Sequence, residues 1–332
     1  MAREIAEIPA AAARLVGRSD EISAIADRIR AFRPRAVVVC GRGSSGNAGV
    51  YLRYLIETQM QLLVSSAAPS IVTAYRRTPD MRGAFFVLIS QSGRSPDLVS
   101  TTEVAREAGA LTLAIINDDR SPAADAADLV LPIGAGPEHA VAATKTVVLS
   151  MIAGAVLVAG ITPDGGLRDG LRRLPERLQS ALGCDWSQWG NSLVSAPAAF
   201  VAARGYGLGT GREIALKVTE TLRLPALGYS AAELRHGPRA AITLETPVLV
   251  LRQNDESASG VDLLVHDLRK ANETVFLAGG PESTLPWIGD DHPAFDPIVM
   301  LLPAYKAIEA AARQRGLDPD RPEHLSKITQ TL

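Results

Sequence analysis

The chain contains 332 residues, of which 47% are hydrophobic and 21% are charged, and its formal net charge is −2. This length and apolar content are enough for two domains that each have a core. The nearly balanced charge gives no electrostatic reason to expect a nucleic-acid partner, because phosphates favour a basic surface. The composition therefore predicts a small polar substrate.

The cysteines and histidines indicate neither disulfides nor a metal site. The two cysteines, Cys40 and Cys184, and the five histidines lack the spacing of a disulfide framework or a ligand set. The first residues are acidic where a signal peptide is basic, and the apolar run at 147–158 is shorter than a membrane span. We therefore expect a soluble, cytoplasmic protein with no cofactor, no metal and no membrane partner.

The front half alternates apolar strands with helices. Residues 36–40 form a short β-branched run that ends in a glycine-rich turn, and 46–60 has the apolar spacing of a helix. The pattern recurs with strands at 84–90 and 111–116 and a helix at 96–108 between them. Continuous apolar strands that alternate with helices predict the α/β fold class, with a parallel sheet covered on both faces.

The back half repeats this pattern. Residues 162–188 lack a strand signal and are expected to form a helix that leads into a new unit. A strand at 198–203 is again followed by a glycine-rich turn, and further strands are predicted at 247–251, 274–278 and 297–302. The two halves therefore indicate an internal duplication of one α/β unit.

The segment from Ser90 to Pro96 is a candidate phosphate site. It reads Ser-Gln-Ser-Gly-Arg-Ser-Pro, in which Ser95 suits a helix N-cap and Pro96 the first helical position. An anion placed there would meet unpaired N–H groups and the positive end of the helix dipole. Ordinary capping explains such a loop equally well, but the second hydroxyl-rich turn, at 41–46, would lie at the same edge of a parallel sheet. We therefore expect a bound phosphate.

Gly41, Gly43 and Gly46 also match the glycine pattern of dinucleotide-binding loops. No acidic residue closes the following strand, so the dinucleotide interpretation is the weaker one.

A candidate acid–base set lies in the back half. Glu213, Lys217 and Glu220 fall at i, i+4 and i+7, so a helix would carry all three on one face. His236 precedes Gly-Pro, and a histidine with a pKa near 6.5 can give or take a proton at neutral pH. The alternatives are a surface ion pair between Lys217 and Glu213, a solvated Glu220 and a histidine locked in a turn.

Five motifs carry a resemblance to a known family. They are Ser90-Gln-Ser-Gly, Val141-Ala-Ala-Thr-Lys145, Ala215-Leu-Lys-Val-Thr-Glu220, Glu233-Leu-Arg-His-Gly-Pro238 and Pro322-Glu-His-Leu-Ser-Lys327. From about residue 30 to the C-terminus the chain resembles the sugar isomerase (SIS) family, specifically the isomerase half of glucosamine-6-phosphate synthase.

The resemblance implies two tandem SIS subdomains, each a flavodoxin-like three-layer sandwich. We expect an N-terminal helical segment at 1–30, one subdomain at 31–175, the second at 176–316 and a tail at 317–332.

The resemblance also implies roles for single residues. The phosphosugar would be bound by Ser90, Gln91, Ser92 and Ser95, with Ser44 or Ser45 from the first loop, and Ala142 is placed with the substrate-binding residues. Glu220 would move a proton between C1 and C2, and Lys217 would assist. His236 would open the sugar ring from the other subunit of a homodimer, and Lys327 would form an imine with the open-chain ketose.

Departures from the synthase shape the expected function. The synthase has an N-terminal glutaminase domain, and this chain begins near the linker. Its first loop looks two residues longer, and Ala143 replaces a serine. We therefore predict an enzyme that converts glucosamine 6-phosphate and water to fructose 6-phosphate and ammonia. The alternatives are a fructosamine-6-phosphate deglycase, a plain phosphosugar isomerase and a non-catalytic phosphosugar sensor.

Overall fold

The computed structural model describes residues 1–289 and 291–327. The chain forms two compact units that exchange short segments. Unit 1 comprises 1–9, 139–144 and 173–325, and unit 2 comprises 10–138, 145–172 and the segment from Ser326 onward. The division expected from the sequence follows chain order, whereas the units are interleaved along the chain.

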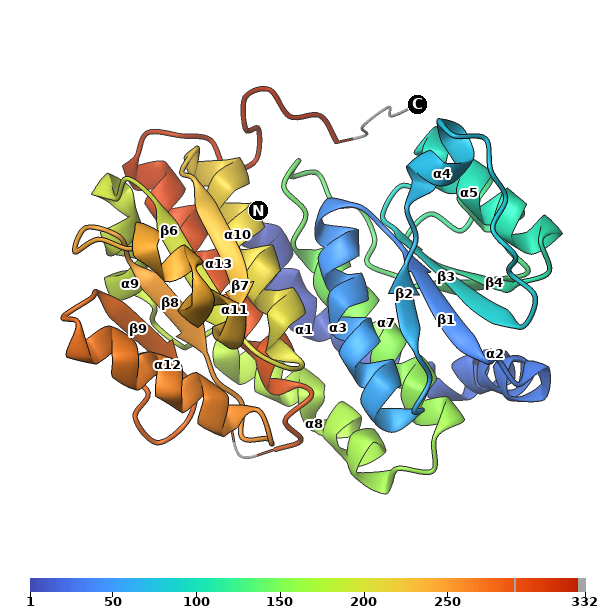
Figure 1. Ribbon diagram of the computed structural model, residues 1–332, viewed down its shortest axis with the longest axis horizontal. Coiled ribbons are helices and arrows are strands. Elements are labelled where there is room, and N and C mark those ends of the chain that lie inside the picture. Colours follow the sequence, from blue (N-terminus) through green and yellow to red (C-terminus); the bar gives the residue numbers. More distant parts are fainter. Residues whose placement is uncertain (290, 328–332) are drawn as a thin grey trace. The chain divides into compact units, whose positions relative to one another are not determined.

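Unit 2 is built on a parallel sheet with the strand order β2-β1-β3-β4-β5 (Figure 1). Its strands are β1 (Ala36–Cys40), β2 (Val64–Ser66), β3 (Ala84–Ser90), β4 (Leu111–Ile116) and β5 (Leu129–Pro132). This order is that of flavodoxin-like sheets, in which ligands bind at the carboxyl ends of the strands. Cys40 is in register with Leu88, so β1 and β3 end at the same edge.

Helices cover both faces of this sheet because its strands are apolar on both sides. They are α2 (Ser19–Phe32), α3 (Gly43–Gln59), α4 (Pro69–Thr73), α5 (Pro96–Glu107), α6 (Pro122–Ala126) and α7 (Lys145–Ile161). Phe86 and Leu88 of β3 share a buried cluster with Leu98 and Ala105 of α5, while α3 and α2 pack against α7. The apolar run at 147–158 lies within the buried part of α7. Within 1–289 and 291–327, no helix combines the length and the apolar character that a membrane crossing requires.

Unit 1 repeats the arrangement with the parallel strand order β7-β6-β8-β9 (Figure 1). Its strands are β6 (Ala199–Ala203), β7 (Ala226–Ser230), β8 (Val248–Leu251) and β9 (Val275–Ala278). Its helices are α9 (Ser187–Ser195), α10 (Gly207–Leu222), α11 (Ala231–His236), the 3-10 turn η1 (Pro238–Ala241), α12 (Ala258–Lys270) and α13 (Asp296–Gln314). Helices α1 (Ala2–Val16) and α8 (Gly165–Ala181) each contribute residues to both units.

Most of the predicted elements are confirmed, including β1, β3 and β4 at the expected bounds. The strand predicted at 297–302 is wrong, because these residues belong to α13. The run is apolar on every side, and all of Ile298–Leu302 is buried where α13 packs against α10 and α9. A short run that is apolar all round shows neither a period of two nor a period of 3.6, so the pattern could not distinguish a strand from a helix.

Candidate functional site

The hydroxyl-rich loop of unit 2 lies where the sequence predicts it, between β3 and the first turn of α5. Ser95 is the N-cap residue with an extended backbone, and Pro96 begins the helix. The Ser95 hydroxyl makes no capping hydrogen bond, so the N–H groups of the first turn are not satisfied by that side chain. Ser92 and Gln91 beside it are half-buried. The amino end of α5 therefore offers backbone N–H donors to an anion.

Glycine is required at position 93 to shape this loop. Gly93 has φ of +64°, and a Cβ there would stand 2.1 Å from Ser121 Oγ. The Gly93 N–H donates to Ser90 Oγ at 3.1 Å, and the Ser90 side chain is buried. Ser90 therefore holds the loop in shape, whereas Ser92 and Ser95 are the more open hydroxyls.

The first loop is joined to the second by an ion pair. Arg42 Nε and Nη2 lie 2.7 Å and 2.5 Å from Asp97 Oδ2, in the first turn of α5. Asp97 is buried, whereas the Arg42 side chain is half exposed. Arg42 is the N-cap residue of α3, and Ser44 and Ser45 lie in the first turn of that helix, after Gly43. The pair therefore brings the amino ends of α3 and α5 to one edge of the sheet, as the sequence predicts.

Cys40 lies beneath these loops at the end of β1. Burial and the nearby Asp97 raise the pKa of its thiol to about 12, against the opposing charge of Arg42. The thiol is therefore protonated at neutral pH and is a poor nucleophile.

The acid–base set of unit 1 forms a connected network on α10. Lys217 Nζ lies 3.6 Å from Glu213 Oε1 and forms a close ion pair with Glu220. Tyr305 of α13 donates a hydrogen bond to Glu213 Oε1 at 3.3 Å. Glu213 and Lys217 are buried, while the Glu220 side chain is 22% exposed.

Lys217 is therefore no surface residue. A buried ammonium between two carboxylates is held in one orientation, because leaving any one of these charges unpaired would be costly. Glu220 is the member of the network that solvent, and hence a ligand, can reach.

His236 ends the short helix α11 and is exposed. The helix is fixed at its other end by a capping box, in which Ser230 Oγ accepts from the Glu233 N–H and Glu233 accepts from the Ser230 N–H. Glu233 in the predicted motif is thus a capping residue.

The tail lysine of the last predicted motif pairs with a carboxylate of its own unit, unit 2. Lys327 Nζ donates to Glu138 Oε2 at 3.0 Å. The Glu138 side chain is fully buried and also accepts from Thr146 of α7, at 3.0 Å from the backbone N–H and 2.8 Å from the hydroxyl.

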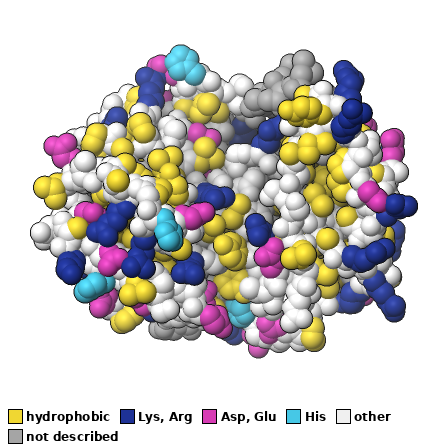
Figure 2. Space-filling view, viewed as in Figure 1, with side chains coloured by type: hydrophobic (Ala, Val, Ile, Leu, Met, Phe, Trp, Pro, Cys, Tyr) yellow, Lys and Arg dark blue, Asp and Glu magenta, His cyan; other side chains and the backbone are white. Residues whose placement is uncertain are grey.

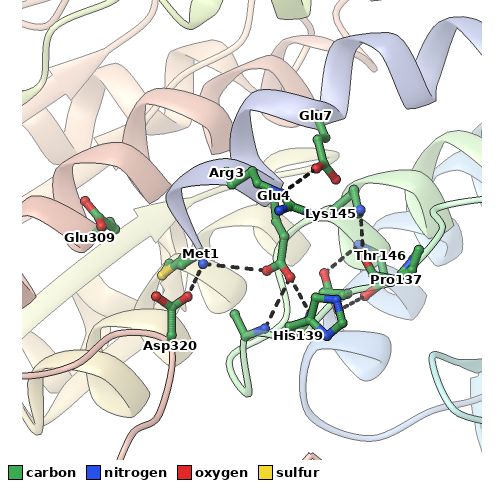
Figure 3. Close-up of polar contacts among 12 residues, drawn as sticks. Met1, Arg3, Glu4, Glu7, Pro137, His139, Lys145, Thr146, Glu309 and Asp320 are labelled. Atoms are coloured by element: carbon green, nitrogen blue, oxygen red, sulfur yellow. Dashed lines mark hydrogen bonds and ion pairs between the residues drawn. The ribbon is translucent and has the colours of Figure 1, made fainter.

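Ala142 is buried and lies in the segment 139–144 of unit 1. Figure 3 shows Glu4 of α1 accepting from the backbone N–H groups of His139 and Ala140. The Val141 N–H donates to Asp320 O at 3.0 Å. The segment is therefore tied to α1 and to the C-terminal tail, and Ala142 has only its backbone to offer a ligand.

Unit 1 also contains a cavity of about 580 Å³ beside α12. Its two arginines are already paired, since Arg252 bonds Asp262 and Arg269 bonds Glu282. Figure 2 shows side chains of both charges crowded over the α11 and α12 side of the molecule. No group of three or more His, Cys, Asp or Glu side chains is arranged to hold a metal ion in the part of the chain that the structure describes.

Several residues of these sites were missed by the sequence reasoning. The Arg42–Asp97 pair had only a weak signal in the sequence. Asp97 follows the predicted helix start, where acidic residues are common, but nothing local identifies Arg42 as its partner. The Glu138–Lys327 and Tyr305–Glu213 contacts had none, since the two residues of each pair lie 189 and 92 residues apart in the chain.

The chain thus combines two parallel sheets with helices on both faces, a hydroxyl-rich helix N-terminus in one unit and a buried carboxylate–ammonium network in the other. The sequence profile of the SIS domain matches residues 32–160 and 192–286. The chain therefore belongs to the SIS domain family.

The chain is also similar to curated proteins that are considerably longer. A glutamine--fructose-6-phosphate aminotransferase [isomerizing] of Symbiobacterium thermophilum is 30% identical over 98% of this chain and 58% of its own length. The chain thus spans little more than half of that relative.

Among solved structures, a Silicibacter pomeroyi DSS-3 protein, provisionally named a phosphosugar isomerase, is 37% identical with a TM-score of 0.91, covering 96% of this chain and 98% of that one. A glucosamine-6-phosphate deaminase of Thermotoga maritima has a TM-score of 0.77 at 20% identity, covering 97% of this chain and 100% of that one, and at this identity it shows the fold alone.

Proposed function

We propose that this protein is an enzyme that acts on a phosphosugar by moving a proton between C1 and C2. The observation that carries the proposal is the Tyr305–Glu213–Lys217–Glu220 network, whose reachable member is a carboxylate. Such a carboxylate is suited to general acid–base catalysis, because a buried cation holds it in place. The hydroxyl-rich amino end of α5 supports a phosphate on the substrate.

Within this class we propose glucosamine 6-phosphate as the substrate, with fructose 6-phosphate and ammonia as the products. His236 opens the ring, Glu220 transfers the C2 proton to C1, and water releases ammonia from C2 of the resulting ketimine. The fold shared with a glucosamine-6-phosphate deaminase supports this choice. In the proposal His236 acts from the second subunit of a homodimer, and its exposed position leaves it accessible to another copy.

The test is a coupled assay for ammonia and fructose 6-phosphate across a panel of phosphosugars. Glucosamine 6-phosphate should give equal amounts of both products, and N-acetylglucosamine 6-phosphate and glucose 6-phosphate serve as comparison substrates. Ammonia-free conversion of glucose 6-phosphate would replace the deaminase with a plain isomerase. Release of glucose 6-phosphate from a fructosamine 6-phosphate would instead identify a deglycase.

A non-catalytic phosphosugar sensor is the candidate of another class. Tight binding of a phosphosugar by calorimetry, with no turnover of any member of the panel, would favour the sensor. The network on α10 favours the enzyme, because it presents a reachable Glu220 carboxylate held by a buried ammonium, and proton transfer needs such a group whereas phosphate binding does not.

A further inference from the structure

Arg94 is the one charged side chain in the loop at 90–96. It lies between Ser92 and Ser95, and its N–H donates to Ser92 Oγ at 3.3 Å. The Arg94 side chain is 49% exposed. The hydroxyls and backbone N–H groups of this loop offer hydrogen bonds without net charge, so Arg94 is the group of the loop that can also neutralise part of an anion's charge.

The backbone beneath Arg94 is held by contacts that do not involve its side chain. The Gly93 carbonyl accepts from the Ala123 N–H at 3.1 Å, and the Gly93 N–H donates to Ser90 Oγ. The guanidinium is bound at its tip instead, where Nη2 donates to Asp118 Oδ2 at 2.8 Å. The Arg94 side chain can therefore change partners while the loop keeps its shape.

The pair between Arg94 and Asp118 is suited to such an exchange, because both side chains reach solvent. Asp118 lies in the turn after β4 with its side chain 36% exposed. The hydrogen bond from Arg94, followed by that from the Arg120 N–H, holds the pKa of the Asp118 carboxyl below its ordinary value. An exposed ion pair contributes little to stability, whereas the Arg42–Asp97 pair has a buried carboxylate that would be left unpaired at a high cost. Of these two arginines, Arg94 is the one that can leave its carboxylate.

A phosphate monoester is a stronger partner for a guanidinium than one carboxylate is. It carries about 1.5 to 2 negative charges at pH 7, and arginine can bind two of its three acceptor oxygens at once. We propose that Arg94 leaves Asp118 to bind the substrate phosphate, and that Asp118 competes with the ligand for the guanidinium. This inference rests on the proposed phosphate site. The exchange changes hydrogen bonds and charge pairing and includes no covalent step.

The competition makes the site selective for a dianion. A ligand with one negative charge offers Arg94 no more than Asp118 already does, so the exchange adds little to its binding. A ligand with two charges gains from the exchange. The substrate class that follows is a phosphate monoester rather than a sulfate ester, which has a similar shape but carries one charge.

The first test titrates inorganic phosphate into the protein by calorimetry, because inorganic phosphate is not turned over and probes the loop without a sugar. Arg94→Gln should raise Kd about tenfold, which is the loss expected for one hydrogen bond to a charged group. Asp118→Asn should lower Kd about threefold, because Arg94 is then no longer engaged. An unchanged Kd in Arg94→Gln would overturn the proposal.

A double-mutant cycle separates direct binding from a long-range effect of charge. If Asp118 acts through Arg94, Asp118→Asn should lower Kd about threefold in the wild-type background and leave it nearly unchanged in the Arg94→Gln background. Equal effects in both backgrounds would show that the two charges act independently and would overturn the exchange. Arg94→Lys keeps the charge but lacks the planar fork, so it should also bind phosphate more weakly than the wild type.

Arg82 and Asp80 provide the matched control. They form an exposed ion pair in the same unit, with Arg82 Nη2 2.6 Å from Asp80 Oδ2, but they precede β3. Arg82→Gln and Asp80→Asn should bind phosphate like the wild type. A Kd that rises as much in Arg82→Gln as in Arg94→Gln would mean that net charge sets the affinity, and the role of Arg94 would be overturned.

The second test compares methyl phosphate with methyl sulfate, which are similar in shape and differ in charge. The wild type should bind methyl phosphate about tenfold more tightly, and this preference should shrink to about threefold in Arg94→Gln. The same preference in both proteins would show that Arg94 does not select the dianion.

The possible failures are distinguishable. Normal phosphate binding in both the wild type and Arg94→Gln would overturn the role of Arg94 and leave the phosphate site in place. A wild type that binds neither inorganic phosphate nor methyl phosphate would overturn the phosphate site and this inference with it. Phosphate binding that depends on Arg94, without turnover of any phosphosugar in the product assay, would overturn the proposed reaction and leave this inference standing.

Discussion

The loop after β3 in unit 2 and the loop after β8 in unit 1 occupy the same place in their sheets but differ in charge. In unit 2, β3 lies beside β1 and leads into α5. In unit 1, β8 lies beside β6 and leads into α12. The first presents Ser92 and Ser95 at the start of α5, whereas the second carries Asp255, which accepts from the Ser257 N–H at 2.9 Å and from its hydroxyl at 2.6 Å. Both helix starts have a carboxylate nearby, but Asp97 in the first turn of α5 is buried and paired with Arg42, whereas Asp255 accepts from the N-cap residue of α12.

The helices after the first strands also differ. In unit 2, α3 begins with Ser44 and Ser45, whereas in unit 1 α10 carries Glu213, Lys217 and Glu220. The topology therefore provides two equivalent edges with different side chains, hydroxyls at the helix starts of one unit and a buried carboxylate–ammonium network in the other, and this difference underlies the roles proposed for them.

Of the changes proposed here, replacing Glu220 should lower activity the most. Glu220→Gln should lower kcat for glucosamine 6-phosphate by about 10²- to 10⁴-fold, because a positioned base is lost. Binding of the substrate, measured by calorimetry, should change little, since the substitution does not touch the loop at 90–96 that is proposed to bind the phosphate. Undiminished turnover would show that Glu220 is not the base.

The two N-cap serines test the phosphate loop directly. Ser95→Ala should raise KM about 10- to 100-fold, because a hydrogen bond to a charged group contributes about 1.5–3 kcal/mol. Ser257→Ala, the matched change at the N-cap of α12, should leave KM unchanged. Equal effects of the two variants would mean that the loops do not differ in function.

The arginine that joins the two loops of unit 2 should matter less. Arg42→Gln removes the pair with Asp97 and should raise KM by roughly threefold, because the first loop is no longer held against α5. Arg252→Gln removes the pair with Asp262 in unit 1 and is the control. A KM that responds to Arg252 and not to Arg42 would reverse the assignment of the units.

The smallest expected effect is on the pH dependence of stability, through the two buried cysteines. The unfolded Cys40 thiol ionises near pH 9, whereas the folded thiol stays protonated up to about pH 12. The unfolded state therefore loses its proton first, and stability falls as the pH rises above 9. Cys40→Ala should reduce this loss by roughly 1 kcal/mol at pH 10, measured as the difference in unfolding free energy between pH 7 and pH 10.

Burial also raises the pKa of the Cys184 thiol in unit 1. The effect of Cys184→Ala on the pH slope should be smaller, because Cys184 is less enclosed than Cys40. A pH slope that Cys40→Ala leaves unchanged would place the thiol in a more polar environment than the fold indicates.

The sequence by itself determined the features that depend on neighbouring residues. The apolar runs of β1, β3 and β4, the Ser95–Pro96 helix start and the shared face of Glu213, Lys217 and Glu220 all follow from local periodicity and capping. These features were enough to indicate an α/β duplication and the position of the hydroxyl-rich loop for which phosphate binding is proposed.

Tertiary structure decided the features that depend on residues distant in the chain. It made 297–302 part of a buried helix, joined Arg42 to Asp97 and paired Lys327 with Glu138. The burial of Lys217 between two carboxylates was also invisible in the sequence, where a surface ion pair has the same spacing. The physical reason is that burial and long-range pairing set the electrostatic environment of a side chain, and neither is encoded in the local pattern.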